Sequence, residues 1–75
     1  RRERLSSAES ERTERLARVV AMAEDVWGNR EQARRFLTTP HAEIANRTPI
    51  DAALTELGAR QAEEVMSRIL YGLPA

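Results

Sequence analysis

The only imidazole of this sequence stands close to a carboxylate. His41 follows Pro40 and is separated from Glu43 by one residue. An imidazole near a carboxylate is the arrangement used in general-base catalysis and, with further ligands, in zinc sites. The sequence has no cysteine and no second histidine, so none of the usual ligand spacings for zinc is present. We therefore expect His41 to be a solvated loop residue, and we predict no metal site.

The hydroxyl and carboxylate side chains also lack the partners that catalysis needs. A serine nucleophile requires a neighbouring base, and no serine has a histidine in a plausible context. In the acidic pairs Glu24–Asp25 and Glu63–Glu64, adjacent positions place the two carboxylates on different faces of a helix. The three glycines are isolated and form no phosphate-binding loop. The sequence thus predicts a protein that is not an enzyme, with no catalytic and no cofactor-binding residue.

The length and net charge of the chain restrict the class of protein further. The chain has 75 residues, with 12 basic and 12 acidic side chains and a formal net charge of zero. A chain of this size buries only about 60% of its unfolded surface, so an oligomer or a partner protein would add stability. Zero net charge disfavours a dedicated nucleic-acid or membrane-surface module. No apolar run approaches the roughly 20 residues that span a bilayer. We predict a cytoplasmic protein with no membrane partner.

The first part of the chain differs in composition from the rest. Residues 1–15 are rich in charge and serine, with Leu5 and Ala8 as weak apolar points. We interpret this stretch as a linker or an exposed helical lead-in. The chain opens on Arg1 and not on methionine, so we expect an upstream segment that is missing here. The predicted organisation is therefore residues 1–15 as lead-in and residues 16–75 as one helical domain.

From residue 16 onward the pattern is that of amphipathic helices. Apolar residues three or four positions apart form one helix face, and Gly28 follows as a glycine that ends the helix. Asn29 is a favourable N-cap for a second helix, which ends before Thr39 and Pro40. The first face consists of Leu16, Val19, Val20, Ala23 and Trp27, and the second of Ala33, Phe36 and Leu37.

Two further helices are predicted after a loop anchored by Ile44. Thr48 is a suitable N-cap, and Pro49 fits the first helical position, where its missing N–H costs nothing. Gly58 is expected to end this helix, and a last helix runs from about residue 59 to 71. The expected buried stripes are Ile50, Ala53, Leu54 and Leu57, and then Ala62, Val65, Met66, Ile69 and Leu70. No period-two alternation indicates a strand, so the sequence predicts an all-α fold: a small bundle of about four helices with a short apolar C-terminal tail.

The landmarks of these helices come in a recognisable order. They are an aromatic–Gly turn (Trp27–Gly28), an aromatic–Leu pair before Thr-Pro (Phe36 to Pro40), an Arg-Thr-Pro helix start (Arg47 to Pro49), Gly58, and a terminal Tyr71–Gly72. From about residue 16 to 75 this ordered set resembles the C-terminal toxin-binding domain of Xre/MbcA/ParS-type antitoxins. Each piece is common by itself, whereas the ordered set is specific.

The resemblance has two departures and one missing part. The family often has tryptophan at the position of Phe36, and Gly-Gly or Gly-Arg where this chain has Ala45–Asn46. Family members usually carry a helix-turn-helix segment upstream, so DNA is expected as a partner only through such a missing segment. The resemblance implies a bacterial antitoxin that binds a cognate toxin, of the RES type that consumes NAD. It also implies that the C-terminal end lies against or inside the toxin's nucleotide pocket.

The chain ends in RILYGLPA, and the toxin-binding hypothesis assigns its contacts to this end. Pro74 biases Leu73 toward an extended conformation, so the tail would lose less entropy on docking. In the alternative, Leu73 and Tyr71 fold back over the domain's own helix as a C-cap contact. The predicted toxin-binding residues are Arg68, Tyr71, Gly72, Leu73, Pro74 and Ala75. A second hypothesis is a dimerisation module of a helix-turn-helix repressor, and a third is a structural adaptor. Across the first two hypotheses, a homo-oligomer or a hetero-complex is expected.

Overall fold

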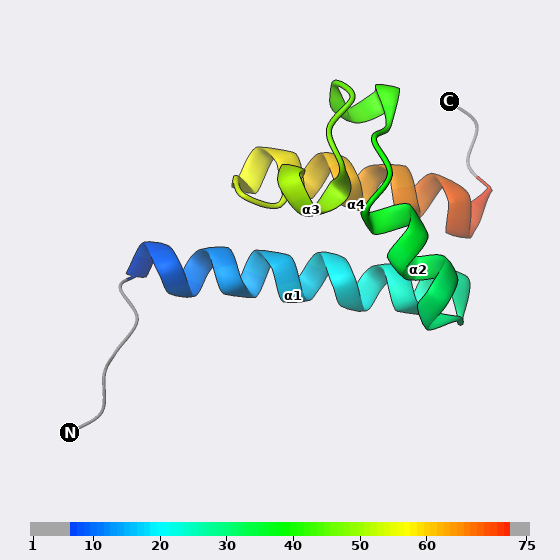
Figure 1. The fold of residues 1–75 in the computed structure, drawn as a ribbon, viewed down its shortest axis with the longest axis horizontal. Helices are drawn as coiled ribbons and strands as arrows, with labels where there is room; N and C mark the ends of the chain where they lie inside the picture. The colour runs from blue at the N-terminus through cyan, green and yellow to red at the C-terminus, as the bar shows by residue number, and fades with distance from the viewer. Residues whose placement is uncertain (1–6, 73–75) are drawn as a thin grey trace.

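A computed structural model describes residues 7–72 of the chain, and these residues form an all-α fold (Figure 1). Within them no strand forms, and the only bridge of β type is the isolated pair His41 and Arg47. The helices are α1 (Ser7–Trp27), α2 (Arg30–Leu37), the 3-10 helix η1 (Ala42–Ile44), α3 (Pro49–Ala52) and α4 (Glu56–Tyr71). The predicted bundle of about four helices is thereby confirmed.

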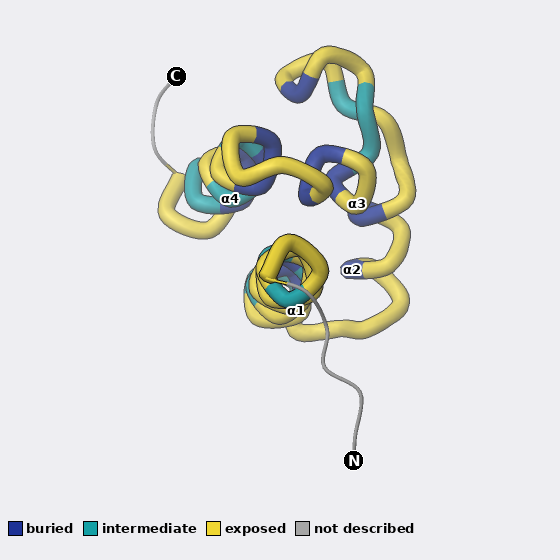
Figure 2. Tube along the Cα trace, turned by 90° about the vertical axis from the view of Figure 1, so that its left-hand side faces the viewer, coloured by how far each residue is buried: buried dark blue, intermediate teal, exposed yellow. Residues whose placement is uncertain are grey.

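The long helices α1 and α4 lie side by side and run in the same direction (Figure 1). The short helices α2 and α3 make the connection between them and pack on one side of the pair (Figure 2). As a result, α1 and α4 finish at the same end of the bundle, and α2 lies at that end as well (Figure 1). The core is the space enclosed by these four helices and η1.

Helix α1 is longer than the sequence pattern suggested, since it starts at Ser7 and continues unbroken to Trp27. Val19 and Ala23 are fully buried, as their positions on the amphipathic face predict. Leu16 was expected on the same buried face, but it is 39% exposed. The division of the chain after residue 15 stays a prediction, and residues 1–6 lie outside the described range.

Helix α2 begins with a side-chain cap. The Oδ1 atom of Asn29 accepts a hydrogen bond of 2.9 Å from the backbone N–H of Gln32, which satisfies one free donor of the first turn. Before it, Gly28 adopts a left-handed φ of 61°, which glycine tolerates without steric cost. Ala33, Phe36 and Leu37 are buried as predicted, and they form the inner face of this helix.

The loop between α2 and α3 is fastened at both ends. The N–H of His41 donates to the carbonyl of Arg47, and η1 between them buries Ile44 completely. Ala45 and Asn46 close the loop in the left-handed region, with φ of 57° and 60°. For alanine this conformation is strained, because its Cβ approaches the backbone. Glycine would adopt this conformation without that strain.

The turn from α3 to α4 corrects the sequence analysis. Thr48 caps α3 by accepting from the N–H of Asp51, and Pro49 is at the start of the helix, but α3 ends already at Ala52. Gly58 does not end a helix; it lies in the first turn of α4, whose N-cap is Thr55. Because the chain turns there, the side chains of Leu54 and Leu57, which were expected in the core, are 61% and 69% exposed, and Ile50 is also exposed.

Small residues make up much of the core. Six of the twelve buried hydrophobic residues are alanine, so the helices can approach one another closely. The closest approach is at Gly58, where an added Cβ would lie 2.0 Å from the carbonyl oxygen of Ala52. The largest fully buried side chains are those of Ile44, Met66, Val19 and Pro49.

Candidate functional site

The last turn of α4 exposes apolar side chains at the end of an otherwise buried stripe. Met66 is fully buried, but Ile69 and Leu70, which were expected to point inward, are 51% and 45% exposed. Tyr71 is 68% exposed and so does not seal the core. No described element covers this turn, which explains why the inward stripe of α4 stops at Met66. The result is an apolar surface at the end of α4.

The polar residues predicted for toxin binding lie on the same turn. Arg68 is paired with Glu64 at 3.6 Å, and the side chains are 40% and 69% exposed, so solvent screens the pair and it holds Arg68 only weakly. Gly72 ends α4 in the left-handed conformation, with φ of 64°. The structure thus brings Arg68, Tyr71 and Gly72 together, whereas Leu73, Pro74 and Ala75 lie outside the described residues.

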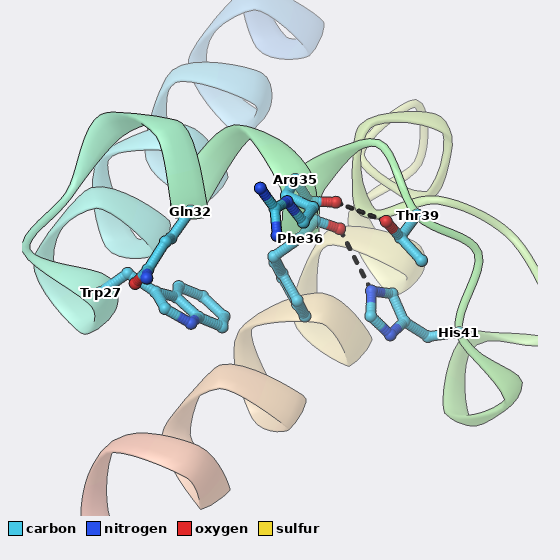
Figure 3. Close-up of a pocket in the computed structure, with 6 residues that line it drawn as sticks. All are labelled: Trp27, Gln32, Arg35, Phe36, Thr39 and His41. Atoms are coloured by element: carbon cyan, nitrogen blue, oxygen red, sulfur yellow. Dashed lines mark hydrogen bonds between the residues drawn. The ribbon is translucent and has the colours of Figure 1, made fainter.

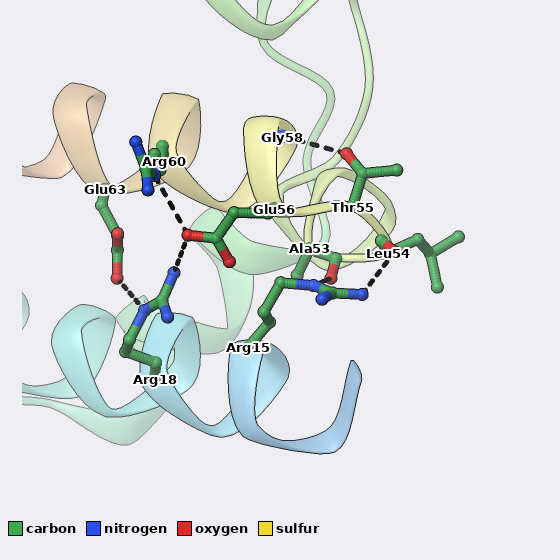
Figure 4. A network of polar contacts seen from close by, with 9 residues as sticks. All are labelled: Arg15, Arg18, Ala53, Leu54, Thr55, Glu56, Gly58, Arg60 and Glu63. Carbon is green, nitrogen blue, oxygen red and sulfur yellow. Dashed lines mark hydrogen bonds and ion pairs between the residues drawn. The ribbon is translucent and has the colours of Figure 1, made fainter. Parts of the chain in front are cut away.

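A network of arginines fixes α4 against α1 (Figure 4). Arg18 of α1 donates to the carboxylate of Glu63 at 2.7 Å and to that of Glu56 at 3.3 Å. Arg60 donates to the same Glu56 oxygen at 3.0 Å. These contacts lower the pKa of Glu56, first through the hydrogen bond from Arg60 and then through the charge of Arg18. The hydrogen bond to Glu63 likewise raises the pKa of Arg18.

The same network fastens the turn before α4 (Figure 4). The guanidinium of Arg15 donates to the carbonyl oxygens of Ala53 at 3.2 Å and Leu54 at 2.8 Å. The hydroxyl of Thr55 then accepts from the N–H of Gly58 at 3.0 Å. The base of α4 is therefore held by α1, and the exposed end of α4 is presented in a defined direction. Sequence reasoning missed Thr55, although a threonine followed by Glu56 is an N-cap signal.

A depression of about 360 Å³ opens between the end of α1, helix α2 and the loop that follows it (Figure 3). Its wall is a series of three rings. The ring centroids of Trp27 and Phe36 are 4.6 Å apart, and those of Phe36 and His41 are 4.5 Å apart. The remaining lining residues are Gln32, Arg35 and Thr39.

His41 is not the solvated loop residue that the sequence analysis expected. It is half-buried against Phe36, and its Nε2 lies 3.1 Å from the carbonyl oxygen of Phe36. A carbonyl oxygen only accepts, so Nε2 carries the proton and Nδ1 is the free ring nitrogen of the neutral form. His41 therefore helps to shape the depression. Sequence reasoning had no direct signal for this, because the contact depends on the bridge to Arg47.

Neither a metal centre nor a membrane span emerges from residues 7–72. In this range no three side chains of the His, Cys, Asp or Glu type are grouped as a metal ion would need. Helices of sufficient length and apolarity to cross a bilayer are also absent from the described residues. What the surface offers is apolar and arginine side chains, which are suited to binding another molecule.

The comparisons with known proteins agree with this kind of surface. Residues 22–72 match the family model of the antitoxin Xre/MbcA/ParS C-terminal toxin-binding domain. The chain therefore belongs to this family. A protein of Pseudomonas putida (strain KT2440) described as "Antitoxin Xre" is 37% identical over 68 residues. That alignment covers 91% of this chain but 43% of the relative, so the chain spans less than half of the relative's length. No solved structure matches the chain.

Proposed function

We propose that this chain is the toxin-binding part of a bacterial antitoxin and that it neutralises a RES-type, NAD-consuming toxin. In this proposal the end of α4 and the residues after it cover the toxin's active site, and the chain performs no catalysis itself. Membership of the toxin-binding family supports the toxin partner. The RES type and the consumption of NAD extend the family resemblance and rest on no contact within this chain.

The observation that carries the proposal is the exposure of Ile69, Leu70 and Tyr71 on one helical turn. Burying a large apolar side chain stabilises a complex by about 1.5–3 kcal/mol, and tyrosine is enriched at the centres of protein interfaces. The opposite end of α4 is fixed to α1 through Arg18, so little ordering of the helix is needed on binding. The end of α4 thus has the properties of a preorganised contact.

The test is the cellular NAD level when the protein encoded by the adjacent reading frame is produced together with this chain. We expect the intact chain to preserve NAD, and a chain that ends at Gly72 or carries Tyr71→Ser to preserve less. Leu57→Ser is the matched control, because Leu57 is equally exposed but lies at the other end of α4. If all these forms preserve NAD equally, the end of α4 is not the inhibitor. If none does, the toxin assignment itself is wrong.

A second candidate function, a dimerisation module, is favoured by the exposure of Leu54 and Leu57. Leu54 lies in the turn before α4 and Leu57 in its first turn, and the proposed toxin contact at the other end of α4 does not use them. A symmetric dimer would bury them against a second copy. Light scattering of the isolated chain distinguishes the two cases, since a dimer that dissociates on Leu57→Ser supports this candidate and a monomer at all concentrations contradicts it.

A further inference from the structure

The aromatic depression has features that the fold itself does not require. Phe36 belongs to the core, whereas Trp27 packs against the core from its edge and stays half-buried, so part of its ring remains accessible. The ring series from Trp27 through Phe36 to His41 forms one wall that is open to solvent (Figure 3). A planar group laid against this wall would meet rings in the offset geometry that aromatic pairs prefer.

Two of the polar side chains beside this wall, those of Arg35 and Gln32, are not engaged by any other described residue. Among the described residues no hydrogen bond or ion pair uses the guanidinium of Arg35 or the side-chain amide of Gln32 (Figure 3). Five other arginines do have such partners, namely Arg15, Arg18, Arg47, Arg60 and Arg68. Five of the nine described arginines thus have partners, and Arg35 is the one among the other four that lines the aromatic wall. A free guanidinium at such a place suits a carboxylate, which it can bind through two parallel hydrogen bonds.

We propose that this depression is a second contact for the partner protein and that it receives an aromatic side chain with a neighbouring carboxylate. The aromatic ring lies against Trp27, and the carboxylate pairs with Arg35. This inference rests on the proposed toxin binding, but it places a contact outside the C-terminal tail. Trp and Arg are the residue types that most often dominate the energy of protein interfaces. We therefore expect Arg35 to contribute a large share of the binding energy, although its side chain is exposed in the free chain.

The position of the depression favours the same partner that meets α4. Trp27 is the last residue of α1 and Tyr71 the last of α4, and both helices finish at one end of the bundle (Figure 1). In the close view, the last turns of α4 pass beside the labelled Trp27 (Figure 3). A protein that covers the end of α4 therefore reaches the depression without any change of shape in this domain.

Charge favours a protein over a nucleic acid as the occupant. Asp25 lies in the last turn of α1 and Glu31 in the first turn of α2, so acidic side chains stand among the arginines of α2 and this part of the surface is not uniformly basic. A phosphate backbone binds by neutralising several charges at once, and these acids would oppose it. A single carboxylate on Arg35 carries one charge and not a row of charges, so it meets less of this repulsion.

The test uses the chain's single tryptophan as a reporter. The chain is labelled with 5-fluorotryptophan, and the unlabelled protein of the adjacent reading frame is added, so the fluorine spectrum reports only on Trp27. The affinity is then measured for the intact chain, for Arg35→Glu and for Arg35→Lys. The matched control is Arg12→Glu, because Arg12 makes no ion pair with another described residue either and lies in the first half of α1, away from α2. Circular dichroism confirms that each variant is folded.

We expect the partner to shift the Trp27 signal and Arg35→Glu to weaken binding by about 30-fold or more, the low end for removing one member of a buried charged pair. Arg12→Glu should bind like the intact chain, and Arg35→Lys should recover part of the affinity. If the partner binds but leaves the Trp27 signal and the Arg35→Glu affinity unchanged, the second contact is wrong while toxin binding stands. If the intact chain forms no complex, both proposals fail. A short DNA duplex that reproduces the shift would overturn the assignment to a protein.

Discussion

Gly58→Ala tests whether the close approach of α3 and α4 organises this domain. A Cβ at position 58 would lie 2.0 Å from the carbonyl oxygen and 2.8 Å from the carbonyl carbon of Ala52. Carbon and oxygen normally stay about 3.3 Å apart or more, so the two backbones would have to separate by more than about 1 Å. Nothing nearby can give way cheaply, because the colliding atoms are backbone and Arg15 holds the next two carbonyls.

The expected loss is large for so small a change. Overpacking costs about 1–3 kcal/mol and sometimes more, while alanine in a helix interior gains about 1 kcal/mol over glycine. We expect the severe end here, a net loss of about 2 kcal/mol, which lowers the melting temperature of a domain this size by roughly 8–16 °C. Because the whole domain is stabilised by about 4–11 kcal/mol, this is a substantial fraction.

The measurement is urea and thermal unfolding followed by circular dichroism. Gly28→Ala is the control, because Gly28 has a left-handed φ of 61° but no atom within 4 Å of an added Cβ. That variant carries only the conformational penalty of about 1–2 kcal/mol. If Gly58→Ala costs less than about 1 kcal/mol, or stabilises the domain as an unhindered exchange of glycine for alanine in a helix does, the packing argument at the α3–α4 turn is wrong.

Two further variants test the loop and the ion-pair network. Ala45→Gly relieves the strain of a left-handed φ of 57°. It should raise the free energy of unfolding, measured in urea, by about 0.5–1 kcal/mol. The control is Ala42→Gly, three residues earlier at an ordinary φ, which should lower the free energy of unfolding. The pKa of Glu56 is lowered in the folded state, so its contribution is fully present above the ordinary glutamate pKa of about 4.3 and is lost as the pH falls through the lowered value. Glu56→Gln should therefore flatten the loss of stability in acid, and Glu43→Gln, on the exposed η1 loop, should leave it unchanged; an equal effect of both would contradict the network.

The sequence was a good guide to the helices and a poorer one to their packing. Asn29 and Thr48 lie at N-caps and Pro49 opens α3, because capping depends on side chains within three residues of the helix start. Local chemistry of this kind can be predicted from residue types alone. The all-α class follows from the same local signals.

Burial depended on contacts that no local pattern contains. The stripe of Ile50, Leu54 and Leu57 has helical spacing, yet Thr55 caps a new helix and breaks the stripe in two. Alanines fill the space where these larger side chains were expected, because α3 and α4 meet at the distance that Gly58 permits. The half-buried position of His41 could not be predicted for the same reason. It depends on the bridge to Arg47, which no local pattern contains.

The exchange of large and small residues between core and surface has a functional consequence. Alanines occupy half of the buried hydrophobic positions, while Leu54, Leu57, Ile69, Leu70 and Tyr71 remain largely in solvent. A single exposed leucine needs no explanation, but three adjacent apolar residues on one turn form a patch. In a domain that is marginal by size, burying them internally would have added stability. Their place on the surface is therefore best explained by association, at the end of a helix whose other end is firmly held.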